Sequence, residues 1–158
     1  MKKFELTTDF ITAFGMKLFR IRATVAFGNV KEGELGGYVE KEENLEQEGN
    51  AWVSGNAWVF GNARVSGNAW VSGDAQVSGD ARVYGNADYA GVKGFGTECR
   101  HTTFFRCKDG KVRVKCGCFY GTIPEFRKQV KATRDGKIAK EYLMIADLME
   151  YHFEQAEE

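Results

Sequence analysis

A six-residue phrase, Gly-(Asn/Asp)-Ala-x-Val-x, repeats with almost no variation between Gly49 and Ala87. Its glycine recurs every six residues as far as Gly85, and its valine recurs with the same period from Val53 to Val83. Because six is not a multiple of 3.6, a helix would spread these valines around its whole surface. A β-branched residue, a glycine and an Asn or Asp in each phrase instead indicate short strands that alternate with tight turns. The repeat therefore predicts a β-solenoid.

Each hexad of this solenoid would supply one flat side and one corner. Val and Ala point inward, the other side chains point outward, and each coil covers its neighbour at the strand spacing of ~4.8 Å. Glycine and asparagine tolerate the left-handed backbone that sharp corners use. One buried valine per hexad contributes roughly 1.5–3 kcal/mol, so a stack of coils is stable where a single coil is not.

The phrase Val-x-Gly-(Asn/Asp)-Ala-x resembles the hexapeptide repeat of left-handed β-helix proteins, which place three hexads in each triangular coil. The match covers Gln47–Asp88 and extends backwards, less regularly, through LGGYVE, where Leu35 and Val39 take inward places. The resemblance implies a short left-handed parallel β-helix of about three coils. The flanking segments LFRIRA, GELGGYVEKEENLEQEGNAWV, CGCFYGTIPEF and AKEYL are similar to phage and prophage proteins of unassigned function.

The resemblance also raises the question of catalysis, because many hexapeptide-repeat proteins are acyltransferases and some are carbonic anhydrases. The first would require a histidine at the coil edge and the second three metal-binding histidines. The only two histidines, His101 and His152, lie outside the repeat. Since a general base must lie within hydrogen-bonding reach of its substrate, we expect a non-catalytic protein without a cofactor. An acyltransferase that receives His101 at a subunit boundary stays open as the alternative.

The distribution of charge divides the chain, although its formal net charge is zero. Residues 1–94 hold ten basic and twelve acidic residues, residues 95–140 hold twelve and four, and residues 141–158 hold none and six. We predict a mainly β chain with an N-terminal β cap over residues 1–34, the solenoid over 35–94, and a C-terminal α+β domain of ββαα order over 95–158.

The segments that flank the repeat show their own patterns. MKLFRIRATVAF alternates apolar and polar residues, so residues 1–29 predict a β hairpin or small sheet over the first coil. TTFFRCKDGKVRVKCGCF predicts a second hairpin with its turn at Asp109-Gly110. One face of this hairpin would carry Val112, Val114, Cys116 and Cys118.

Two helices are predicted after this hairpin. TIPE begins the first, with Thr122 as N-cap and Glu125 completing a capping box. Asp135-Gly136 separates it from a second helix that begins near Lys137. Its buried side would hold Tyr142, Ile145, Leu148 or Met149, and Phe153.

Several large side chains occupy outward positions of the repeat. If a coil holds 18 residues, Trp52 stacks with Trp70 and Arg64 stacks with Arg82. Such aromatics either cover one another and stabilise the coil, or form a partner-binding or oligomer face, because interfaces favour Trp, Tyr and Arg. The candidate residues of that face are Trp52, Trp58, Phe60, Arg64, Trp70, Arg82 and Tyr84.

The C-terminal domain offers a second candidate surface, which is basic. Aromatic residues lie among its cations, a combination that suits nucleic acid. The acidic residues of 147–158 can neutralise this surface in place, so a protein or acidic partner is favoured over nucleic acid. The candidate residues are Arg106, Lys108, Lys111, Arg113, Lys115, Arg127, Lys128 and Lys131.

The cysteines and His101 are the candidate zinc ligands of the chain. Cys99, Cys107, Cys116 and Cys118 lack the paired Cys-x2-Cys spacing that marks a zinc site, so we expect structural thiols and no metal, although metal binding stays open. The N-terminus does not look like a signal peptide, and no apolar run is long enough to span a membrane. We therefore expect reduced thiols and a cytoplasmic protein, in a bacterial host.

Together these features predict a phage- or prophage-type accessory protein that binds a protein partner through a rigid β-helix and a basic domain. Proteins encoded by phage often act against host machinery, so the resemblance implies a host defence component, such as a CRISPR effector, as one candidate partner. We also expect a homo-oligomer, either a trimer or a dimer, with no membrane association. Nucleic-acid binding is a further alternative.

Overall fold

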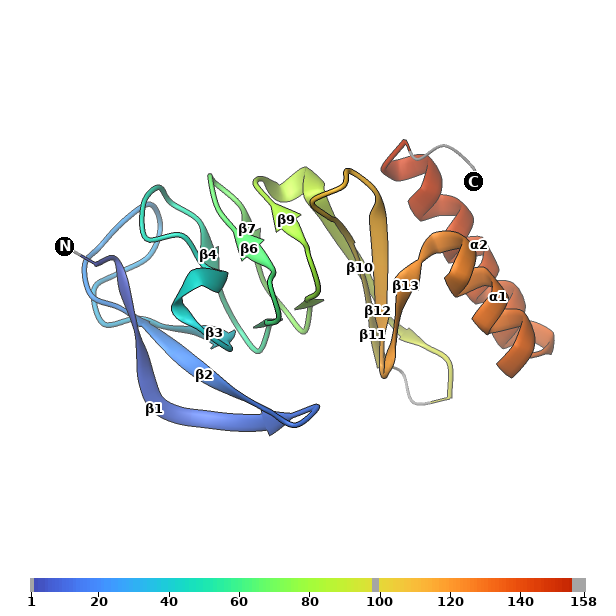
Figure 1. Ribbon diagram of the computed structural model, residues 1–158, viewed down its shortest axis with the longest axis horizontal. Coiled ribbons are helices and arrows are strands. Elements are labelled where there is room, and N and C mark those ends of the chain that lie inside the picture. Colours follow the sequence, from blue (N-terminus) through green and yellow to red (C-terminus); the bar gives the residue numbers. More distant parts are fainter. Residues whose placement is uncertain (1, 98–99, 155–158) are drawn as a thin grey trace.

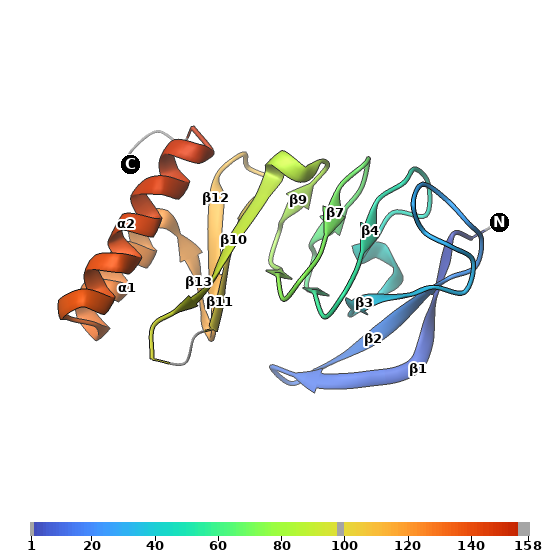
Figure 2. The same cartoon turned by 180° about the vertical axis from the view of Figure 1, so that it is seen from behind.

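The computed structural model describes residues 2–97 and 100–154, which build an elongated, mainly β molecule (Figure 1). The solenoid, a sheet and two helices follow one another along its length, with the N-terminal hairpin beside the solenoid, and Figure 2 shows the same arrangement from behind. The elements are β1 (Phe4–Ala13), β2 (Met16–Ala23), β3 (Leu35–Val39), η1 (Glu42–Asn44), β4 (Trp52–Val53), β5 (Trp58–Val59), β6 (Arg64–Val65), β7 (Trp70–Val71), β8 (Gln76–Val77), β9 (Arg82–Val83), η2 (Asn86–Asp88), β10 (Tyr89–Phe95), β11 (Arg100–Arg106), β12 (Val112–Cys116), β13 (Phe119–Thr122), α1 (Ile123–Thr133) and α2 (Gly136–His152).

The hexads form the short strands β4 to β9, which pair in parallel. Trp52 of β4 lies opposite Trp70 of β7, and Arg64 of β6 lies opposite Arg82 of β9, so the register is 18 residues as predicted. β5 pairs with β8 in the same register, and the three pairs belong to three different sheets. The valines and alanines of the hexads from Ala51 to Val83 are buried in one core. The predicted β-solenoid is confirmed.

Glycine forms the corners of this solenoid. The hexad glycines from Gly49 to Gly79 have φ values between 61° and 74°, which is the left-handed region. A Cβ atom on Gly67 would collide with the backbone carbonyl oxygen of Tyr84. The corners therefore need glycine both for its conformation and for the close approach of neighbouring coils. Gly85 has an extended backbone instead, and the regular coil ends there in η2.

Backbone hydrogen bonds join neighbouring coils, and outward residues donate their N–H groups to the next coil, as Trp52 N does to Ala69 O. The first coil has no full coil before it, so carbonyl groups at its N-terminal edge need other donors. Three different donors cover them: backbone N–H groups of β3 and its flank on one side, the Asn44 amide on the second, and the Lys3 ammonium on the third. At the C-terminal end the free N–H groups of Trp70 and Gln76 donate to Asn86 Oδ1 and Thr103 Oγ1.

The N-terminal hairpin is formed as predicted, but it extends one side of the solenoid. β1 pairs with β2, β2 pairs antiparallel with β3, and β3 pairs in parallel with β5, so all four belong to one sheet with β8. Val39 is buried as expected. The inward place predicted for Leu35 is wrong, because the chain reaches the solenoid core only at Gly36 and Gly37 and Leu35 is exposed.

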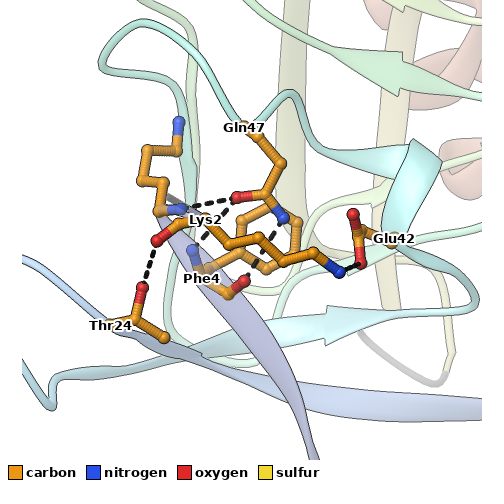
Figure 3. A network of polar contacts seen from close by, with 6 residues as sticks. Lys2, Phe4, Thr24, Glu42 and Gln47 are labelled. Carbon is orange, nitrogen blue, oxygen red and sulfur yellow. Dashed lines mark hydrogen bonds and ion pairs between the residues drawn. The ribbon is translucent and has the colours of Figure 1, made fainter.

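Residues next to the N-terminus close the first coil with a polar network (Figure 3). The side-chain oxygen of Gln47 accepts from Lys3 N at 2.7 Å and from Phe4 N at 3.2 Å, and its amide nitrogen donates to Phe4 O. Lys2 forms an ion pair with Glu42 at 2.7 Å, and Thr24 donates to the carbonyl of Lys2. The cap is thus tied to the coil by both backbone and side chains.

The C-terminal domain contains four strands rather than the two predicted. β10, β11, β12 and β13 form an antiparallel sheet in chain order, and α1 and α2 follow as expected. The ββαα prediction is therefore wrong in its strands. β10 begins at Tyr89, inside the segment assigned to the solenoid, and its glycine-rich sequence lacks a strand pattern. β13 has only four residues.

The two faces of this sheet have different neighbours. Phe105 and Cys107 belong to the core of the solenoid, whereas Phe104 and Val114 pack with the two helices. The backbone N–H of Lys108 also donates to Asp80 O at 2.9 Å. The sheet is therefore the C-terminal cap of the solenoid and the floor of the helical layer at the same time.

Most local predictions in this domain are confirmed. The turn at Asp109-Gly110 joins β11 to β12, and the capping box is present, with Glu125 N donating to Thr122 Oγ1 at 3.2 Å. Cys118 is the exception, because it lies exposed in the turn after β12 and not on the strand face. Of the two alternatives on the second helix, Met149 is buried and Leu148 is exposed.

Within residues 2–97 and 100–154, none of the helices has the length and apolar composition that a membrane crossing requires.

Candidate functional site

The predicted aromatic strip does not form one exposed face. Trp52 is fully buried, with the ring of Phe27 packed edge-on against it at 5.4 Å between centroids. Phe60 is also buried, and the ring of Phe14 stacks on it at 5.9 Å. The expectation that these two aromatics are exposed is therefore wrong, because the chain covers them with its own N-terminal segment.

The remaining aromatics of the strip are in mixed environments. Trp58 is half-buried beneath Phe14, at 6.1 Å between ring centroids. Trp70 is half-buried, and its indole N–H donates to Ser54 Oγ at 2.9 Å. Tyr84 alone is largely exposed, at 59 %. Most of the outward aromatics thus pack against the chain itself.

The arginines of the strip are arranged differently. Arg64 and Arg82 lie side by side on β6 and β9, and no ion pair to either is found among the described residues. Arg82 Nη1 donates to the carbonyls of Asn62 at 2.8 Å and Ala81 at 2.9 Å, so its charge meets only neutral acceptors. Like charges opposite one another on neighbouring strands destabilise a sheet. Folding alone gives no reason for this pair.

A hollow of about 460 Å³ lies over these arginines. It brings solenoid residues together with Lys108 of the C-terminal sheet region, although the charge pattern of the sequence places Lys108 on a separate surface. The hollow is lined by Lys41, Glu43, Asn62, Ala63, Arg64, Asp80, Arg82 and Lys108.

Two further hollows continue it. One of about 420 Å³ shares Glu43 and Arg64 and reaches Tyr84. The other, of about 390 Å³, shares Asp80 and Lys108 and reaches Arg113. Because lining residues are shared, the three form one continuous depression along the β6–β9 side. We call its positively charged part the cationic groove, defined by Lys41, Arg64, Arg82, Lys108 and Arg113.

Arg113 lies at the C-terminal end of the cationic groove and is only partly neutralised. One guanidinium nitrogen contacts Asp109 at 2.8 Å. Its Nη1 atom is buried and finds no hydrogen-bond acceptor among the described residues. A buried donor without an acceptor costs free energy, and its burial keeps this nitrogen out of reach of a ligand.

The titratable groups beside Arg113 have fixed charge states at neutral pH. A backbone hydrogen bond from Lys111 and the contact with Arg113 lower the pKa of Asp109. Burial raises the pKa of Tyr120 to about 12 and also raises the pKa of the Cys107 thiol. The thiol and the phenol are therefore neutral, and Cys107 is not an activated nucleophile.

The predicted basic surface of the C-terminal domain is dispersed by the fold. Lys115 is buried, with its ammonium over the ring of Phe14 at 4.1 Å. Arg127 is held by Asp147 at 2.8 Å and Glu150 at 3.0 Å, which confirms that acidic residues of the C-terminal segment neutralise part of this surface. Arg106 contacts Asp88 at 3.3 Å. Lys111 is exposed beside the β11–β12 turn, and Lys128 and Lys131 are exposed on α1. Only Lys108 and Arg113 line the groove.

Sequence reasoning missed Lys41, Asn62 and Asp80 as lining residues. Asn62 and Asp80 occupy the Asn/Asp position of two hexads 18 residues apart, two residues before Arg64 and Arg82. Stacking them with the 18-residue register would have placed them beside the arginines. Lys41 lies in the irregular segment before the repeat, where no such register applies.

The cysteines and histidine do not come together. Cys107 lies in the solenoid core, Cys116 beside the helices and Cys118 at the surface, while Cys99 lies outside the described residues. No group of three or more His, Cys, Asp or Glu residues that could hold a metal is found in the part of the chain that the structure describes. His101 Nδ1 lies 2.9 Å from Thr103 Oγ1, and burial lowers the pKa of its ring.

Comparison with known proteins supports the solenoid. Residues 57–73 and 75–87 match the family described as YdcK beta solenoid repeat, which covers most of the regular hexads. No curated protein shows significant similarity to the chain. The chain is a beta-solenoid repeat protein.

Proposed function

We propose that this protein is a non-catalytic binding protein whose cationic groove holds an acidic, extended segment of a protein partner. The observation that carries the proposal is the stacked pair Arg64 and Arg82, for which no carboxylate partner is found among the described residues. Arg113, which is ion-paired with Asp109, adds a further guanidinium at the other end of the groove. Guanidinium groups bind carboxylates in a planar, bidentate geometry, so two of them one strand apart suit successive carboxylates of an extended chain.

The charge of the groove favours a peptide over nucleic acid. The depression that contains its five cations is also lined by five carboxylates, those of Glu42, Glu43, Glu46, Asp80 and Asp109. A phosphate backbone presents one negative charge after another and would meet these carboxylates along its path. A protein segment with mixed charges can place its own cations there, which gives specificity through complementary charge.

The scaffold beneath the groove supports tight positioning of a ligand. β6 and β9 are parts of a coil whose inward side chains are buried, so the two arginines project from a rigid surface. Rigid presentation lowers the entropic cost of binding. We propose for this scaffold a left-handed β-helix of about three coils, since the 18-residue register corresponds to three hexads per coil.

The biological setting follows from the sequence resemblance. We propose a phage- or prophage-type accessory protein that acts in the cytoplasm of a bacterial host. We propose a component of a host defence system, such as a CRISPR effector, as its partner, because proteins encoded by phage often act against host machinery.

Binding of labelled peptides measured by fluorescence anisotropy tests the proposal. A Glu-rich peptide that also contains Lys residues should bind, and Arg64→Gln/Arg82→Gln should weaken it about tenfold or more, the effect of losing charged hydrogen bonds worth roughly 1.5–3 kcal/mol. Lys128→Gln/Lys131→Gln on α1 is the matched control, because it removes the same charge outside the groove. Binding unaffected by the groove variant, or stronger binding of a single-stranded oligonucleotide, would contradict the proposal.

A hexapeptide-repeat acyltransferase is the alternative function, and it would need His101 as its general base. The surroundings of His101 do not favour that role. The ring is half-buried and bonded to Thr103, and it lines none of the three hollows of the depression. Transfer of an acetyl group from acetyl-CoA, abolished by His101→Gln, would reinstate it.

A further inference from the structure

The turn that joins β12 to β13 carries two cysteines, Cys116 and Cys118, which the proposed function does not use. Cys116 lies opposite Phe119 in the sheet, so Gly117 and Cys118 form a two-residue turn. The left-handed backbone falls on Gly117, whose φ is 58°, and not on Cys118. Glycine at the first turn position suits a tight hairpin, which fixes where the two cysteines stand.

Both cysteine side chains line one hollow of about 180 Å³ between this turn and the two helices. Two sulfurs can be joined only if the Cα atoms lie roughly 4.4–6.8 Å apart and the side chains point the same way. A tight turn meets the first condition for residues two positions apart, and the shared hollow meets the second. Both cysteines are free thiols in the structure.

The two thiols differ in their access to solvent. Cys118 is exposed, whereas Cys116 is half-buried and its sulfur accepts a hydrogen bond from Thr102 Oγ1 at 3.3 Å. Cys107 is buried in the solenoid core, where burial raises the pKa of its thiol. Among the described cysteines, Cys118 is therefore the one that a dissolved reagent reaches first.

The rim of the hollow carries a cation. Arg134, next to the end of α1, lines the hollow and is exposed. Its Nη1 atom donates to the carbonyl of Thr133 at 3.4 Å, and no ion pair of Arg134 is found within residues 2–97 and 100–154. Since a guanidinium in this situation attracts carboxylates, the hollow favours a small reagent that carries negative charge.

We propose that Cys116 and Cys118 form a reversible redox pair, which an anionic disulfide of low molecular weight, such as glutathione disulfide, oxidises. The Cys118 thiolate attacks the reagent, forms a mixed disulfide and releases one glutathione thiolate. The Cys116 thiolate then attacks the Cys118 sulfur, which forms the Cys116–Cys118 bond and releases the second glutathione thiolate. The protons of the two protein thiols end on the two released thiolates, so two protein thiols are oxidised and one glutathione disulfide is reduced.

The hydrogen bond from Thr102 makes this disulfide easy to reduce. Cys116 must leave the buried Thr102 hydroxyl to bond with Cys118, so the oxidised turn loses an interaction that the dithiol keeps. Strained and exposed disulfides are the labile ones that follow the redox state of their surroundings. The pair is therefore a sensor and not a structural bridge. It is independent of the cationic groove, because neither cysteine lines the three hollows of the depression.

Mass spectrometry of the wild-type chain tests the pair. The protein is equilibrated with mixtures of reduced and oxidised glutathione, alkylated with iodoacetamide in denaturant and digested with trypsin. The digestion places both cysteines in the peptide CGCFYGTIPEFR, residues 116–127, and separates them from Cys99 and Cys107. This peptide should lose two hydrogens as the share of glutathione disulfide rises and regain them as it falls.

Four variants test the roles of single residues. Cys116→Ser should stop at a mixed disulfide on Cys118, and Cys118→Ser should react about tenfold more slowly, because Cys116 is half-buried. Thr102→Val keeps the shape without the hydroxyl and should favour the disulfide by about two- to tenfold. Arg134→Gln should slow oxidation by glutathione disulfide but not by the neutral hydroxyethyl disulfide. Lys128→Gln, on α1 outside the hollow, is its matched control.

The proposal would be overturned if peptide 116–127 kept both thiols in excess glutathione disulfide, if a mixed disulfide persisted in the wild type, or if the bond joined two chains. A Cys118→Ser variant that reacts as fast as the wild type would overturn the order of attack. Equal slowing of both reagents by Arg134→Gln would overturn the preference for an anionic disulfide. Circular dichroism verifies that the variants keep the fold.

Discussion

Lys3 lies buried at the N-terminal end of the solenoid, where the first coil has no preceding strand. Its ammonium donates to Ala51 O at 2.7 Å and to Gly49 O at 3.3 Å, and it lies 4.7 Å from the ring centroid of Phe27. Burial lowers the pKa of Lys3 to about 8, although the charge of Glu46 opposes the shift. The Lys3 ammonium thus takes the place of the backbone N–H groups that a preceding strand would donate, although its burial removes part of its hydration.

Replacing Lys3 by Met should destabilise the fold by about 1–3 kcal/mol, because two carbonyls lose their donor while the packing on Phe27 is kept. The pH dependence gives a sharper readout. Between pH 8 and 10.5 the unfolded chain holds a proton on Lys3 that the folded chain has released, so the free energy of unfolding of the wild type rises through this window. Below pH 8 the Lys3 side chain is protonated in both the folded and the unfolded chain. It then contributes nothing to the pH dependence of the free energy of unfolding.

Urea unfolding of the wild type and Lys3→Met at several pH values measures both effects. The difference between the two proteins isolates Lys3 from the other groups that titrate in this range. Lys2→Met is the control, because Lys2 is exposed and ion-paired with Glu42 at the surface. A constant difference from pH 8 to 10.5 would show that Lys3 is not desolvated.

The hairpin β1–β2 is the element that links the two ends of the molecule. Its tip residue Phe14 contacts Trp58 and Phe60 of the solenoid, and the ammonium of Lys115 from β12 lies over its ring. Phe14 adopts a φ of 52°, which is unusual for a residue with a side chain. The tip contacts offset this strain and cover an aromatic surface that would otherwise face solvent.

Phe14→Ala should destabilise the protein by about 1–2 kcal/mol, since it removes two aromatic contacts and a cation–π contact from a half-exposed ring. Trp58 should become more accessible, which acrylamide quenching of tryptophan fluorescence measures. Phe10→Ala should leave the quenching unchanged, because Phe10 lies on the same hairpin but contacts Phe19 at 5.8 Å and the Lys17 ammonium at 4.8 Å. Equal quenching in both variants would mean that the hairpin tip does not shield Trp58.

At the scale of the whole molecule, the solenoid and the C-terminal sheet share one core. Phe105 and Cys107 of the sheet region are buried among the valines and alanines of the hexads. The edge of the last coil is closed by side-chain acceptors on the C-terminal side, among them Thr103 Oγ1. We expect the solenoid and the sheet to unfold together, because neither covers its apolar surface without the other.

Phe105→Ala should lower the free energy of unfolding by about 3–5 kcal/mol, the usual cost of truncating a buried phenylalanine. Tryptophan fluorescence reports on the solenoid, and far-ultraviolet circular dichroism at 222 nm, a wavelength dominated by helices, reports on the C-terminal layer. Both transitions should move to lower urea concentration by the same amount. Independent domains would instead give two separate transitions, of which only one responds to the substitution.

The sequence by itself determined the features that depend on near neighbours. The six-residue period specifies the strands, the corner glycines and the buried valines, because each position repeats the same local environment. The turn at Asp109-Gly110 and the cap at Thr122 were also predictable, since turn and cap chemistry is contained within a few residues. The pairing of Arg64 with Arg82 follows from the 18-residue register alone, because three hexads complete one coil.

Only the tertiary structure decided which outward side chains remain exposed. Trp52 and Phe60 are covered by Phe27 and Phe14, residues more than twenty positions away whose approach no local pattern encodes. The cationic groove likewise joins the solenoid arginines to Lys108, which reaches them because the sheet caps the last coil. Periodicity fixes the shape of each coil through contacts between identical neighbours, whereas the surface depends on where non-repeating segments fold back.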